Sequence, residues 1–187
     1  VFVMMNMAGY RVAAYSIAED RILASDNGGF MQQLHAVIDD VRADLLGYQA
    51  RGVGFFATFG NSLGSELAMA STKQIPEISA VVLNTVRGST SEFIWHSPYG
   101  KDFKPGYEEQ GYTEARMYNE LKDVEAAEGL SKLGKRPVLL YYSKADKTIP
   151  PRNTELLVTA LAAHHVRHRV IRNTYLGHFM ASVKNHM

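Results

Sequence analysis

The chain has 187 residues, of which 46% are hydrophobic and 21% are charged, and its formal net charge at pH 7 is +1. This composition predicts one globular domain over residues 1–187. A near-neutral charge gives no electrostatic basis for binding nucleic acid, and no apolar run reaches the ~18 residues of a membrane span. The absence of cysteine excludes disulfides and thiolate metal sites and fits a reducing compartment, so we expect a cytoplasmic protein.

The first half of the chain alternates between strand and helix patterns. A strand is expected over residues 10–17, and strands over 53–59 and 78–83 enclose a helical stretch from Ser65. Between the first two strands, apolar residues recur at three- and four-residue steps, which predicts an amphipathic helix: Met31, Leu34, Ile38, Val41, Leu45 and Tyr48. This alternation predicts an α/β fold, with a mostly parallel sheet flanked by helices on both faces.

Residues 87–134 interrupt the alternation and are rich in aromatic side chains. A helical face follows from Met117 to Leu130. Two interpretations are open: an ordinary connection whose aromatics plug the end of the sheet, or a small lid over an apolar pocket. The aromatics are Phe93, Trp95, Tyr99, Phe103, Tyr107, Tyr112 and Tyr118.

The last third of the chain places a titratable residue after each of two further strand patterns. Residues 137–142 lead into a polar turn that contains Asp146, and residues 169–172 lead into a loop that contains His178. Ligands of open parallel sheets bind at the carboxyl edge of the strands. We therefore expect both side chains at that edge. His164, His165 and His168 are interpreted as a solvated helix end and not as a metal site.

The segment Gly60-Asn61-Ser62-Leu63-Gly64 joins the strand at 53–59 to the following helix. A serine at the apex of such a turn is exposed to substrate, and small flanking residues let strand and helix pass closely. The N–H of the next residue begins a helix and can point at a developing oxyanion. Because a serine hydroxyl is a poor nucleophile alone, the pattern needs a base and an orienting acid.

These three segments, in the order Ser, Asp, His, resemble the catalytic segments of the α/β-hydrolase superfamily. Residues 7–12, Met-Ala-Gly-Tyr-Arg-Val, are similar to the entry into the superfamily's fourth strand. The resemblance covers nearly the whole chain. Ser65 departs from it, because a second glycine is common at that position.

The resemblance implies a serine hydrolase that cleaves a small-molecule ester or thioester by acyl transfer, with no cofactor and no metal. Ser62 would be the nucleophile, His178 the base and Asp146 the acid. The Leu63 backbone N–H would be one oxyanion donor. Residues 87–134 would form the lid, and we expect the substrate to contact Trp95, Phe93, Asn61 and Phe179.

Two alternatives stay open. An acyltransferase or a peptidase could use the same triad, and activity on a model ester without transfer to added alcohols or amines would favour a hydrolase. A non-catalytic binding or scaffold protein could keep the same fold. Labelling of Ser62 by a fluorophosphonate would distinguish an enzyme from such a non-catalytic protein. The sequence leaves the oligomeric state open.

The start of the chain carries a further expectation. In the superfamily a third strand lies between the fourth and the fifth, and the loop after it supplies the second oxyanion donor. Only nine residues precede Tyr10, whereas a parallel crossover needs a dozen or more. We therefore expect residues 1–5 to end a crossover helix, with the third strand upstream of this fragment. A strand from residues 1–9 beside residues 10–17 and 53–59 would contradict this.

Overall fold

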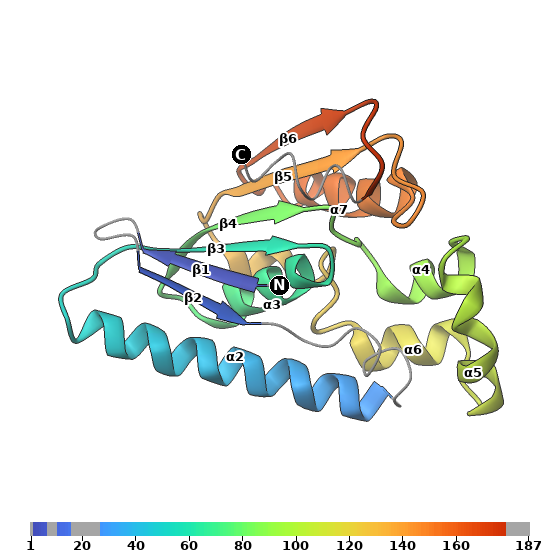
Figure 1. Ribbon diagram of the computed structural model, residues 1–187, viewed down its shortest axis with the longest axis horizontal. Helices are drawn as coiled ribbons and strands as arrows, with labels where there is room; N and C mark the ends of the chain where they lie inside the picture. The colour runs from blue at the N-terminus through green and yellow to red at the C-terminus, as the bar shows by residue number, and fades with distance from the viewer. Residues whose placement is uncertain (1, 7–10, 16–26, 179–187) are drawn as a thin grey trace.

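The computed structural model of the protein describes residues 2–6, 11–15 and 27–178, which contain a six-stranded sheet of order β2-β1-β3-β4-β5-β6 (Figure 1). Strands β3 to β6 are parallel to one another. This confirms the predicted α/β fold with a mostly parallel sheet. The strands are β1 (Phe2–Asn6), β2 (Arg11–Tyr15), β3 (Phe56–Asn61), β4 (Ile78–Asn84), β5 (Val138–Ser143) and β6 (His168–Asn173).

Three longer helices accompany the strands. The 23-residue α2 (Asn27–Gln49) lies beside α3 (Leu63–Gln74), and α7 (Pro151–Ala163) connects β5 to β6. The predicted amphipathic helix is confirmed in α2, whose inward residues form part of the core because they repeat at helical spacing. They are Leu34, Ile38, Val41 and Leu45.

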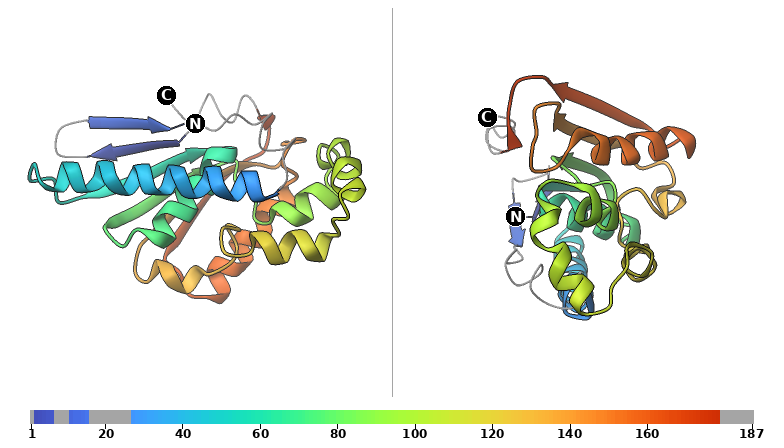
Figure 2. Two further views of the ribbon diagram at one scale, coloured as in Figure 1. Left: turned by 90° about the horizontal axis from the view of Figure 1, so that it is seen from below. Right: turned by 90° about the vertical axis from the view of Figure 1, so that its right-hand side faces the viewer.

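Side-chain direction shows that α3 and α7 pack on the same face of the sheet (Figure 2). The Thr58 hydroxyl on β3 lies 2.7 Å from the Thr72 hydroxyl on α3, and Tyr142 on β5 donates to Glu155 on α7. Thr58 aligns with Val81, and Val81 aligns with Val138. Because strand residues alternate between faces, Thr58 and Tyr142 point the same way. For the opposite face, the prediction of a helical layer stays untested.

The expectation for residues 1–5 is wrong. Residues 2–6 form β1, which pairs antiparallel with both β2 and β3. The expectation compared the nine residues before Tyr10 with the dozen or more that a parallel crossover needs. Antiparallel neighbours, in contrast, can be joined by a connection of only a few residues. Strand β1 thus occupies the position between β2 and β3 that we expected an upstream strand to fill. The strand predicted at residues 10–17 is confirmed as β2.

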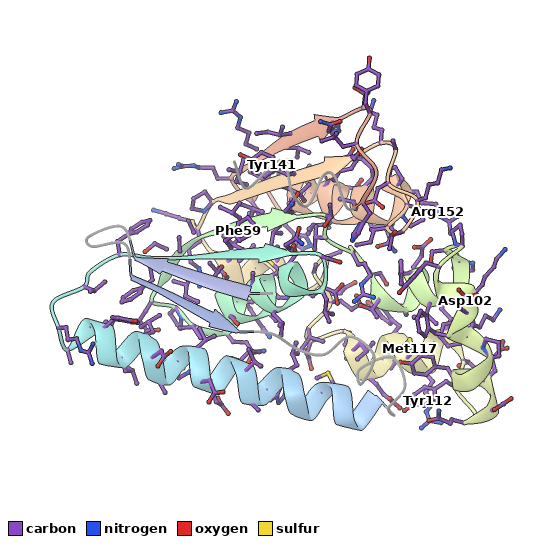
Figure 3. All side chains as sticks on the ribbon, viewed as in Figure 1. Phe59, Asp102, Tyr112, Met117, Tyr141 and Arg152 are labelled. Carbon is purple, nitrogen blue, oxygen red and sulfur yellow. The ribbon has the colours of Figure 1, made fainter. Side chains whose placement is uncertain are left out.

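Residues 87–134 form a helical segment, of which residues 90–121 lie beyond the carboxyl ends of β3 and β4 (Figure 1). Residues 130–133 instead pack against α3. Figure 3 shows Tyr112 and Met117 in this segment, away from Phe59 and Tyr141 on the strands. Both Tyr112 and Met117 are buried, so part of the predicted aromatic cluster is core. The elements are α4 (Thr90–His96), η1 (Gly100–Asp102), α5 (Lys104–Glu109), α6 (Glu114–Leu121) and η2 (Leu130–Leu133).

Two local predictions are wrong in detail. The helical face predicted from Met117 to Leu130 is interrupted, because α6 ends at Leu121 and Leu130 begins η2. His168 lies on β6 and not on the helix end that carries His164. Of the helices in the described ranges, none has the length and apolar character needed to cross a membrane.

Candidate active site

The predicted strand–turn–helix at Ser62 is confirmed. Strand β3 ends at Asn61, α3 begins at Leu63, and Ser62 between them has φ 53° and ψ −125°. A positive φ is strained for a residue with a side chain, and such strain is typical of functional turns. Gly60 is required for close packing, because a Cβ there would lie 2.1 Å from the Gly64 carbonyl oxygen.

Ser65 is the residue that departs from the superfamily pattern. Its side chain connects the first turn of α3 to the ends of β3 and β4 by hydrogen bonds. Its hydroxyl lies 2.8 Å from the Gly60 carbonyl oxygen and 2.7 Å from the Asn84 carbonyl oxygen, and it accepts the Asn84 N–H at 3.1 Å. The Ser62 N–H donates to the same Asn84 carbonyl at 2.9 Å. The Ser65 hydroxyl therefore stabilises the turn that carries Ser62.

The structure brings Ser62, His178 and Asp146 together, as predicted. Asp146 follows β5, and its Oδ2 lies 2.7 Å from His178 Nδ1. The Nε2 of His178 lies 3.1 Å from Ser62 Oγ. Asp146 is 5% exposed, and its Oδ1 accepts the Thr148 and Ile149 N–H groups at 2.9 Å each. The two backbone N–H groups thus fix one oxygen of the carboxylate, and the other oxygen faces the imidazole.

This geometry fixes what the imidazole can do. A carboxylate at Nδ1 favours the tautomer with a proton there, because the carboxylate only accepts. The other nitrogen, Nε2, then carries the lone pair that accepts the hydrogen bond of the Ser62 hydroxyl. The arrangement can move a proton from Ser62 to His178 during attack on a carbonyl.

The other predicted site residues are placed less directly. Leu63 is the first residue of α3, where a helix has unsatisfied N–H groups. Asn61 accepts a hydrogen bond from the Asn84 side chain at 2.9 Å. Phe93 is buried, Trp95 is half-buried against the core, and Phe179 lies outside the described residues. Their contact with substrate stays a prediction.

A buried ion pair beside the site was missed. Glu66 lies four residues after Ser62, and its carboxylate accepts two hydrogen bonds from the Arg87 guanidinium, one of them 3.0 Å long. The guanidinium carbon lies 4.9 Å from the centre of the Phe93 ring. The two charged side chains are about 5% exposed. No local pattern joins them, since they are 21 residues apart.

A second buried carboxyl group, that of Glu125, holds the start of α4. It accepts the Thr90 N–H at 2.6 Å and the Ser91 N–H at 3.2 Å. Burial raises the pKa of the Glu125 carboxyl to about 7, while the Thr90 N–H opposes this and Glu66 adds to it. Burial also lowers the pKa of Lys73, which donates to the Glu125 carbonyl at 2.7 Å, to about 8.

Glu125→Gln should make the free energy of unfolding less dependent on pH. The folded-state pKa of Glu125 is about 7, above the ordinary 4.5. Its contribution to stability is therefore complete below pH 4.5 and is lost as the pH rises through 7. Relative to the wild type, the variant should gain up to about 3 kcal/mol over that range. Urea titrations at several pH values measure this, with exposed Glu109→Gln as control. A constant difference across the range would contradict it.

Comparison with known proteins places this site in a family. The sequence pattern of the prolyl oligopeptidase family matches residues 56–187, which is more than half of the chain. The chain belongs to the prolyl oligopeptidase family. It is therefore a member of the α/β-hydrolase superfamily, as the three segments predicted. No curated protein sequence matches the chain.

Solved structures share the fold of this prolyl oligopeptidase family member. The acylaminoacyl peptidase of Pyrococcus horikoshii is 18% identical with a TM-score of 0.54, over 64% of this chain and 19% of its own. A puromycin hydrolase is 18% identical with a TM-score of 0.52, over 65% of this chain and 18% of its own. The chain thus spans about a fifth of the length of these structures.

Proposed function

We propose that the protein is a serine hydrolase that uses Ser62, His178 and Asp146 as a catalytic triad. The observation that carries the proposal is the continuous hydrogen-bonded path from Asp146 Oδ2 through the imidazole to Ser62 Oγ. The positive φ of Ser62 and membership of the prolyl oligopeptidase family support it. A binding protein would have no need for this path.

The proposed reaction has two acyl-transfer steps. Ser62 Oγ attacks the substrate carbonyl carbon and gives its proton to His178 Nε2, while Asp146 stabilises the imidazolium. The Leu63 N–H stabilises the oxyanion at the start of α3. The leaving group takes the proton from His178 as its bond to the carbonyl breaks. Water then attacks the acyl-enzyme with His178 as base, which releases the acid and restores Ser62.

Family membership favours a peptide or amide bond as the substrate, with an amine as the leaving group. The ester or thioester expected from the sequence is the alternative, because the same triad attacks either carbonyl. A lid role for residues 87–134 belongs to this proposal, supported by the position of α4, α5 and α6 beyond the carboxyl ends of the strands. Hydrolysis rates for matched p-nitroanilide and p-nitrophenyl substrates with the same acyl group would separate the two classes.

A fluorophosphonate probe tests the proposal directly. We expect one covalent adduct per chain, and mass spectrometry of the digested protein should locate it on Ser62. The probe reacts only with a hydroxyl that a neighbouring base activates. Ser65 provides the matched control, because it is a buried serine three residues away on α3 whose hydroxyl is engaged with backbone carbonyls.

Two outcomes would contradict the proposal. An unlabelled, folded protein would favour a binding or scaffold role for the fold. An adduct on a serine other than Ser62 would place the nucleophile elsewhere. If labelling succeeds and added alcohols or amines intercept the acyl group faster than water does, the protein is an acyltransferase.

A further inference from the structure

The loop that leads from the end of β6 to His178 is short. Residues 174–178 follow the last strand residue, Asn173, and Tyr175 in this loop is 88% exposed. An exposed loop has many accessible conformations, and only a few of them place an imidazole between a carboxylate and a hydroxyl. The position of His178 therefore depends on what fixes the start of this loop.

The Asn173 side chain folds the start of the loop. Its Oδ1 accepts the Tyr175 N–H at 2.8 Å and the Leu176 N–H at 3.0 Å. This is an Asx turn, in which a short side chain replaces the carbonyl of a backbone turn. The turn fixes residues 173–176, and His178 follows two residues later.

The Asn173 main chain fixes the other loop of the site. Its carbonyl oxygen accepts the Lys144 N–H at 2.7 Å, where the chain leaves β5 toward Asp146. Asn173 also aligns with Ser143 at the end of the β5–β6 pairing, and the Ser143 hydroxyl accepts the Ala145 N–H at 3.2 Å. One residue thus holds the starts of the loops that carry the acid and the base.

We propose that Asn173 is a positioning residue that sets the orientation of His178 relative to Asp146 and Ser62 through its side-chain turn. The proposal rests on the proposed function for its kinetic consequence, but its structural consequence can be measured without activity. It predicts that the acceptor atom Oδ1 is what matters at this position. The Asn173 carbonyl contact to Lys144 is kept in any variant, so a side-chain change affects the base loop selectively.

The test compares Asn173→Ala, which removes the acceptor, with Asn173→Asp, which keeps it. A misplacement of about 1 Å lowers catalysis by as much as about 100-fold, so Asn173→Ala should lower kcat roughly 10- to 100-fold with little change in KM. Asn173→Asp should retain most of kcat. Arg169→Ala, an exposed change on the same strand, should behave as the wild type. The thermal midpoint of each variant checks that it is folded.

A second readout does not depend on turnover. The proton on His178 Nδ1, hydrogen-bonded to Asp146, should give a low-field proton NMR signal, assigned by its loss in His178→Gln. We expect this signal in the wild type and in Asn173→Asp, and its broadening or loss in folded Asn173→Ala. A merely structural role at the strand end would lower the thermal midpoint and leave the signal in place.

The outcomes separate the two proposals. An Asn173→Ala protein that keeps both kcat and the low-field signal overturns the positioning role, and so does a wild type without that signal. A wild type that shows the signal but is unreactive toward a fluorophosphonate overturns the proposed function. In that case, loss of the signal in Asn173→Ala would still support the positioning role.

Discussion

Ser62→Ala is expected to lower the hydrolysis rate at least about 10³-fold, because members of a triad act as a unit and the loss of one removes the advantage of all. In the wild type, His178 Nε2 lies 3.1 Å from Ser62 Oγ. Without this hydroxyl, His178 has no nucleophile to deprotonate. The remaining rate would come from binding and from the Leu63 N–H. Initial rates on a p-nitroanilide or p-nitrophenyl substrate measure the effect.

The same change should leave the free energy of unfolding nearly unaltered. Ser62 is half-buried and holds a strained φ of 53°, and alanine loses only the hydroxyl. The matched control is Ser65→Ala, which removes the contacts to Gly60 and Asn84 and should destabilise the turn by about 1–3 kcal/mol. An unchanged rate in purified, folded Ser62→Ala would show that the nucleophile is another residue.

The residues of the candidate triad could be predicted because each lies within five residues of the end of a strand. Ser62, Asp146 and His178 are far apart in the chain, but a parallel sheet brings the carboxyl ends of its strands to one edge. Recognition of the strands was therefore sufficient to place the three side chains together. The order Asp146 to His178 to Ser62 was implied by the resemblance to the α/β-hydrolase superfamily, and the hydrogen bonds follow that order.

Other features depend on contacts that carry no local signal. The strand β1 was mistaken for a helix end because a short connection excludes only a parallel neighbour. The sequence pattern of a strand does not indicate whether it pairs parallel or antiparallel. The apolar spacing from Met117 to Leu130 persists through a turn, because residues outside a helix can also face the core. Val124, between α6 and η2, is buried in this way.

The pair of Glu66 and Arg87 is the clearest feature that sequence reasoning missed, and it gives the second large expected effect. Arg87→Met should destabilise the fold by about 3–5 kcal/mol, because it leaves the Glu66 carboxylate buried without its guanidinium. The two residues join the first turns of α3 to the segment after β4. Urea denaturation of the variant and the wild type measures the difference.

A double variant decides whether the charge or the packing matters. Glu66→Met combined with Arg87→Met removes both charges and keeps similar apolar volume, so it should be more stable than Arg87→Met alone. Arg42→Met is the matched control, since it breaks an exposed ion pair with Asp39 and should change stability by less than about 1 kcal/mol. If the double variant loses the sum of the losses measured for Glu66→Met and for Arg87→Met separately, packing and not the buried charge holds α3 to this segment. If Arg87→Met costs no more than Arg42→Met, the pair does not stabilise the fold.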